Sequence, residues 1–176
     1  MTFVTTDDYY LNIFKPSLEF HFRQFIPNTS GITATQYLQA SLKLNNFLKN
    51  IIQQEPKKLH CQINIKDMMK VVQSFHEFNF QGTSDYPEYL KKIFFYESSM
   101  VYESKFNKKA DIELFKEKIC EAYNSVFKQD KVSREMIFND EWNKGESYAF
   151  TRNYEGFIEE KVEEDQLMVN ANNNNN

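Results

Sequence analysis

Hydrophobic residues recur at helical spacing along most of the chain up to about residue 130. The longest pattern runs from about residue 35 to residue 54 and repeats apolar side chains every three or four positions, as one buried helix face requires. A second pattern, over about 111–127, places apolar residues at i, i+3, i+4 and i+7. Two more patterns begin near Ile65 and after Asp85. Together they predict an all-α fold, a small helical bundle.

Capping residues mark where several of these helices should begin. Asn64 is followed three residues later by Asp67, which is typical of an N-cap with an acidic first turn. Asp85 can cap the next helix, with Pro87 in its first turn. Near the amino end, Pro16 allows either two short helices or one kinked helix.

The segment 55–65, EPKKLHCQINI, breaks the helical period. Pro56 disfavours helical backbone at the residue before it. Cys61, Ile63 and Ile65 then alternate with polar residues, as in extended backbone. We therefore expect a fixed crossing loop or a short strand here.

Beyond residue 129 the pattern loosens, although large aromatic residues continue to residue 157. Such side chains bury ~150–250 Å² each when packed, and nothing further along the chain can cover them. An irregular C-terminal extension is expected, and the chain looks like a piece of something larger. The expected organisation is short helices over 1–32, a helical domain over 33–130, the start of a further module over 131–160 and an acidic, poly-Asn disordered tail over 161–176.

Composition excludes several classes of protein. The 25 acidic residues outnumber the 21 basic ones, so no broad basic surface is available to neutralise the phosphates of a nucleic acid. No stretch approaches the ~18–20 consecutive apolar residues of a membrane helix, and the first residues do not resemble a signal peptide. We expect a cytosolic protein that binds neither nucleic acid nor membrane.

Three kinds of catalytic or ligand site lack support in the sequence. The glycines are too few and too scattered for a phosphate-binding GxxxxGK[ST] or GxGxxG loop, so the chain should not hydrolyse ATP alone. A metal site is rejected because no CxxC or HxxxH spacing occurs. A cysteine nucleophile likewise has no supporting motif. The residues weighed for these roles are His60, Cys61, His76 and Cys120.

A local basic cluster interrupts the acidic chain at Lys57, Lys58, Lys66 and Lys70. Lys66 falls in the first turn of a predicted helix, where its side chain and the backbone N–H groups could both face an anion. A plain solvated lysine is the alternative interpretation. Both stay open.

Residues 56–75, PKKLHCQINIKDMMKVVQSF, resemble the dynein heavy chain pattern PxKxHYxFNLRDxxxVxQG. Downstream, Glu97 and Val101 match a family helix, and MIFNDEW at 136–142 resembles the family's MFGDF motif. The resemblance covers about residues 5–160. In the first segment the residues that match in register are Pro56, Lys58, His60, Asn64, Asp67, Val71 and Gln73.

This resemblance implies the helical lid of the third AAA module of a dynein, running into the fourth. Such a lid couples nucleotide state to movement of a ring of AAA modules, which would be the partners of this chain. The dynein complex and the microtubule would be reached only through a longer chain. No cofactor is expected on this chain alone, whereas the complete motor uses ATP and ADP. The NLRD form of the motif suggests an axonemal dynein of a cilium or flagellum.

By position, the resemblance also makes Lys66 the basic residue that senses the terminal phosphate of a nucleotide. The family usually has Arg there, which offers a planar fork of donors, whereas Lys offers a point charge. An independent helical adaptor, or a truncated and inactive gene product, is the alternative to a motor piece. The two differ in whether the chain folds and stays soluble without partners.

Overall fold

The computed structural model describes residues 7–26, 28–53, 62–77 and 85–139, together with 149–150 and 159–160. Its body is a small helical bundle, which confirms the predicted all-α fold. Two strands of two residues each, β1 (Ala149–Phe150) and β2 (Glu159–Glu160), pair antiparallel and were not expected from the sequence.

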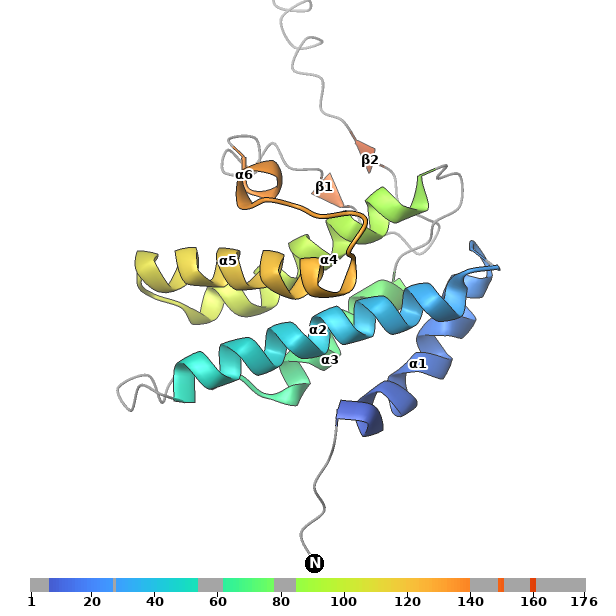
Figure 1. Cartoon of the computed structure of the whole chain (residues 1–176), viewed down its shortest axis with the longest axis horizontal. Coiled ribbons are helices and arrows are strands. Elements are labelled where there is room, and N and C mark those ends of the chain that lie inside the picture. Colours follow the sequence, from blue (N-terminus) through green and yellow to red (C-terminus); the bar gives the residue numbers. More distant parts are fainter. Residues whose placement is uncertain are drawn as a thin grey trace, which may run out of the picture.

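The helices follow the predicted order closely. They are α1 (Asp7–Arg23), α2 (Ser30–Gln53), α3 (Ile65–Glu77), α4 (Tyr86–Tyr102), the 3-10 turn η2 (Glu103–Lys105), α5 (Lys109–Val126) and the single turn α6 (Arg134–Ile137). Figure 1 shows α2 running through the middle of the bundle, where it contacts α1, α3 and α5. α3 packs in turn against α4.

α1 is one helix, although Pro16 lies inside it. Proline has no N–H and its ring crowds the carbonyl four residues earlier, which normally bends or ends a helix. Both Pro16 and Asn12, the residue that bears that carbonyl, are exposed to solvent. Water can therefore hydrate the freed carbonyl, and Leu18 and Phe22 on the opposite side stay fully buried.

α2 begins at Ser30, earlier than the helical period alone indicated. Gly31 lies in its first turn, and a Cβ placed there would lie 3.0 Å from the Glu19 carboxylate of α1. That carboxylate is the far end of a flexible side chain, so a small shift of Glu19 would make room for a larger residue at position 31.

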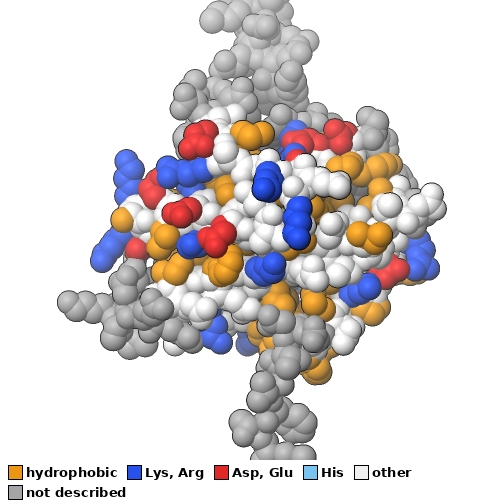
Figure 2. Space-filling view, in the orientation of Figure 1, with side chains coloured by type: hydrophobic (Ala, Val, Ile, Leu, Met, Phe, Trp, Pro, Cys, Tyr) orange, Lys and Arg blue, Asp and Glu red, His pale blue; other side chains and the backbone are white. Residues whose placement is uncertain are grey.

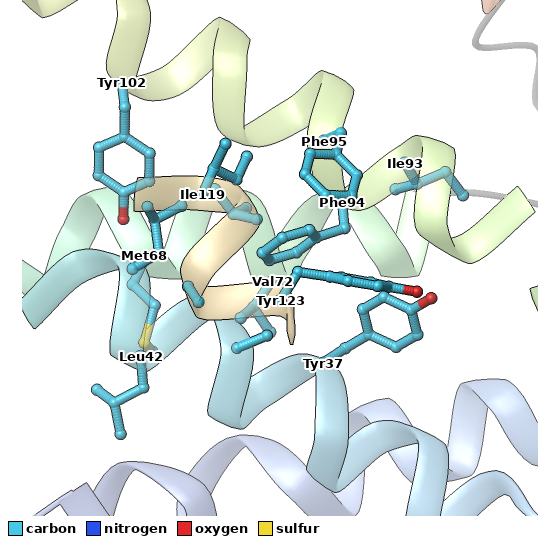
Figure 3. Close-up of a cluster of buried hydrophobic side chains, with 14 of the residues drawn as sticks. Tyr37, Leu42, Met68, Val72, Ile93, Phe94, Phe95, Tyr102, Ile119 and Tyr123 are labelled. Carbon is cyan, nitrogen blue, oxygen red and sulfur yellow. The ribbon is translucent and has the colours of Figure 1, made fainter. Parts of the chain in front are cut away.

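Aromatic rings fill the core between the helices. Phe75 of α3 lies 5.1 Å from the ring of Tyr37 in α2 and 6.1 Å from that of Phe22 in α1, measured between centroids. Figure 3 shows the neighbouring part of the core, where Tyr37 and Tyr123 lie beside Phe94 and Phe95. Burying such rings is the main stabilising contribution of the bundle.

The chain leaves α5 along a path fixed by polar side chains. The Asn124 amide donates to the Val132 carbonyl at 2.8 Å and accepts from the Val132 N–H at 2.8 Å. Asp130 accepts a 2.8 Å hydrogen bond from the Tyr123 hydroxyl and pairs with Lys91 of α4 at 3.3 Å. The segment 127–133 is therefore attached to both α4 and α5.

Candidate functional site

The start of α3 has the N-cap at Asn64 that the sequence predicted, and Asp67 makes it reciprocal. The Asn64 side chain accepts from the Lys66 N–H at 2.8 Å, and the Asp67 carboxylate accepts from the Asn64 N–H at 2.9 Å. Asp67 also donates its own N–H to the Asn64 carbonyl. Each of these two side chains thus satisfies a backbone group that the helix leaves open.

The cap is tied by an ion pair to η2, the turn that directly follows α4. The Lys105 ammonium lies 2.8 Å from Asp67 Oδ1 and donates to the Gln62 carbonyl at 3.1 Å. The Asp67 side chain is only 4% exposed, and a buried carboxylate is tolerated when it is paired and hydrogen-bonded, as here. We call Gln62, Asn64, Asp67 and Lys105 the clasp.

A second polar contact joins the same two helices. The Ser74 hydroxyl of α3 donates to the buried Glu97 carboxylate of α4 at 2.7 Å. Between this contact and the clasp, α3 turns apolar side chains into the core: Met68, Val71, Val72 and Phe75. The pairing of α3 with α4 is therefore specified in register by two polar contacts as well as by hydrophobic packing.

Lys66 lies between the two capping residues, and its side chain is exposed to solvent. Lys70 and Gln73 lie on the same outer face of α3, one and two turns further on, and are also exposed. The backbone amides of Asn64, Lys66 and Asp67 are all used by the cap. An anion at this end of α3 would therefore have to be held chiefly by the Lys66 ammonium.

The other predicted motif residues divide into two groups. Asn64 and Asp67 come together in the clasp, whereas Gln73 points away from it. Pro56, Lys58 and His60 lie outside the described residues. Lys105 was not expected to take part, because nothing in the neighbouring sequence points from it to Asp67.

A pair of imidazoles joins α1 to α3. The rings of His21 and His76 lie edge to face with centroids 5.6 Å apart, and His21 also packs against Phe25. Burial, and then the neighbouring His21, lower the pKa of His76 from its ordinary value. This contact favours neutral histidine, because a proton would bring a charge into a partly desolvated place.

The described residues show no further reactive site. Cys120 is buried, and burial raises the pKa of its thiol to about 11, which opposes formation of a nucleophilic thiolate. Among the described residues, no three His, Cys, Asp or Glu side chains gather as a metal site would need. A shallow apolar hollow is lined by Phe22, Phe25, Ile26, Tyr86 and Leu90, and it has no room even for a molecule the size of water, so it is not a ligand pocket.

None of the helices in the described part of the chain combines the length and apolar character needed to cross a membrane. Comparison with known protein families, with curated proteins and with solved structures finds no match to this chain.

Proposed function

We propose that this chain is the helical lid of an AAA module in a dynein-type motor, and that α3 presents Lys66 to a nucleotide held by a neighbouring large subdomain. The observation that carries the proposal is the clasp. Asn64 and Asp67, two residues in register with the dynein pattern, fix the first turn of α3 and leave the Lys66 side chain exposed between them.

The chemistry of this arrangement suits a sensor that acts on another domain. A lysine on a helix end that is fixed to the bundle offers a compact positive charge, and this charge moves when the bundle moves. The clasp joins that helix end to α4, so a pull on Lys66 by a phosphate would reach two helices together. The chain itself has no phosphate-binding loop, so it would neither cradle nor hydrolyse ATP alone.

The setting that we propose is the motor ring of a cilium or flagellum, with adjacent AAA modules as partners. The most direct test is to sequence the transcript on both sides of this reading frame. We expect a Walker A and a Walker B segment upstream and a second Walker A downstream, all in frame. A transcript that ends where this sequence does would overturn the motor assignment.

The role of Lys66 is tested in the complete motor by comparing Lys66→Ala with Lys70→Ala, its exposed neighbour one turn away. Loss of one charge-assisted hydrogen bond to a phosphate should weaken nucleotide binding at this module by about tenfold. Lys70→Ala should change it little. Equal effects of the two variants would mean that Lys66 contributes only general positive charge.

An independent helical adaptor is the second candidate, and the closed core favours it. Side chains from α1 to α5 bury one another almost completely, including Phe22, Phe75, Phe94 and Phe115. Such a core can support a domain that folds alone. A single cooperative melt of the isolated chain, together with a transcript that lacks neighbouring AAA segments, would support the adaptor and exclude the motor.

A further inference from the structure

Residues 128–133, which lead from α5 to α6 (Figure 1), are bound to the bundle at two positions, and we call them the exit strap. At the first position, the Asp130 carboxylate accepts a hydrogen bond from the Tyr123 hydroxyl at 2.8 Å. At the second, both backbone groups of Val132 bond the Asn124 amide at 2.8 Å each. The two positions are two residues apart, a span of at most about 7 Å of chain, so a large movement of either one displaces the other.

The two partners of the first bond differ in their exposure to solvent. The Asp130 side chain is 50% exposed, whereas Tyr123 is buried in the core, where its ring stacks on Phe127 with centroids 4.3 Å apart. Figure 2 shows one face of the molecule, on which charged side chains lie between hydrophobic ones. If the exit strap moved away, water could hydrate the Asp130 carboxylate at once. The Tyr123 hydroxyl would lose a charged acceptor in apolar surroundings, which is unfavourable.

The neighbouring hydroxyl of Tyr37 in α2 does not replace that acceptor. Figure 3 shows the oxygens of Tyr37 and Tyr123 beside each other, and both residues are buried. Burial, and then the charge and hydrogen bond of Tyr123, raise the pKa of Tyr37 well above its ordinary value. Because this hydrogen bond favours the protonated form of Tyr37, Tyr37 is its donor. Tyr123 thus accepts from Tyr37 and donates to Asp130.

Lys91, the other partner of Asp130, depends less on the exit strap. Its ammonium lies 3.3 Å from Asp130 but 2.6 Å from Glu88, which belongs to the same helix, α4. Lys91 therefore keeps a carboxylate partner wherever the strap lies. A pair with a half-exposed carboxylate also contributes little to stability. The Tyr123 hydroxyl, and not Lys91, determines how firmly the strap is held at Asp130.

We propose that the exit strap opens and closes as one unit, and that the buried hydroxyl of Tyr123 holds it closed. Opening breaks the bonds at Asp130 and at Val132 together. Because α6 begins directly after the strap, opening also changes the position of α6 relative to α5. This inference stands independently of the proposed function.

Hydrogen exchange at the Val132 amide, followed by NMR in the full chain, tests the proposal. Asp130→Ala should speed this exchange about tenfold, although position 130 does not bond Val132, because the strap loses its hydrogen bond to a charged acceptor. Gln129→Ala is the matched control, since Gln129 is the exposed neighbour of Asp130, and it should change the rate by less than about twofold. An unchanged rate in Asp130→Ala would show that the two attachments open separately and would overturn the proposal.

Tyr123→Phe tests the role of the hydroxyl, because it keeps the ring and removes only the donor. We expect it to speed Val132 exchange about as much as Asp130→Ala does, and the double variant to be faster than either by less than about twofold. Independent effects of the two changes would assign the contribution of Asp130 to Lys91 and refute the role of Tyr123. Exchange in α3 is measured in the same spectra. An equal increase there would mean that the strap opens only when the bundle unfolds, which also contradicts the proposal.

Discussion

The two sides of α3 are held to the bundle by different kinds of contact. Towards α4, α3 is bound through the clasp and the Ser74–Glu97 hydrogen bond, which are directional and fix one register. Towards α1, it is bound through edge-to-face ring contacts, with His21 against His76 and Phe22 against Phe75. A hydrogen bond or ion pair is lost when its two helices shift along each other, whereas packed rings can stay in contact after a small shift. The comparison therefore predicts that α1 is the easier helix to release.

The largest effect is expected from removing the ring that anchors α1. Phe22→Ala should lower the free energy of unfolding by about 3–4 kcal/mol, because Phe22 is fully buried and leaves a cavity against Phe75. Hydrogen exchange should speed up in α1 much more than in α4. Phe20→Ala is the control, since Phe20 is on the exposed side of the same helix. Uniformly faster exchange in both helices would refute the separation of the two sides.

Breaking the clasp should come next in size. Asp67→Asn removes the charge paired with Lys105, and because that lysine is partly exposed, the expected loss is about 2 kcal/mol. Chemical denaturation of the variant measures this loss. Glu121→Gln is the control, since it alters an exposed pair with Lys118 and should cost less than about 0.5 kcal/mol. Similar losses in the two variants would mean that the clasp contributes no more to the free energy of unfolding than an exposed ion pair does.

A gain in stability is expected inside α4. The buried hydroxyl of Ser98 has no hydrogen-bond partner among the described residues, and burying an unpaired polar group is unfavourable. Ser98→Ala should therefore raise the free energy of unfolding by about 1 kcal/mol. The same change at Ser41, whose hydroxyl donates to the Tyr37 carbonyl at 2.8 Å, should bring no gain. Thermal melts of both variants decide the matter.

The smallest effect should appear with pH, on the α1 side. The pKa of His76 is lowered in the folded chain, so the unfolded chain takes up a proton first as the pH falls. Stability from this group is complete well above pH 6.5 and decreases as the pH falls through 6.5 towards the folded pKa. Melting temperatures between pH 7.5 and 5.5 should fall more for the unaltered chain than for His76→Gln. Equal decreases in the melting temperatures of the two proteins would show that His76 does not cause the pH dependence.

Periodicity and capping residues predicted most of the fold. The helices at 111–127 and after Asp85 lie within a few residues of α5 and α4, and the Asn64 cap begins α3 as expected. These features depend on neighbours in sequence, which local patterns report well. The early start of α2 was missed, because the apolar period becomes regular only from about residue 35, more than one turn after Ser30.

The candidate site was predictable only in part. Asn64 and Asp67 bond within four residues of chain, so their cap was visible in the sequence. Lys105 joins Asp67 across a separation that closes only when α3 and α4 pack, and no local pattern encodes such a contact. The same reason hid the His21–His76 contact. The proposed role of Lys66 comes from the family resemblance and stays a prediction.

The Asn124 side chain determines how the chain leaves α5. Its amide group bonds both the N–H and the carbonyl of Val132. Asp130 forms an ion pair with Lys91 and accepts a hydrogen bond from Tyr123. These bonds hold residues 130–132 against α4 and α5, so the direction in which the chain runs from α5 to α6 is set by polar contacts of single side chains.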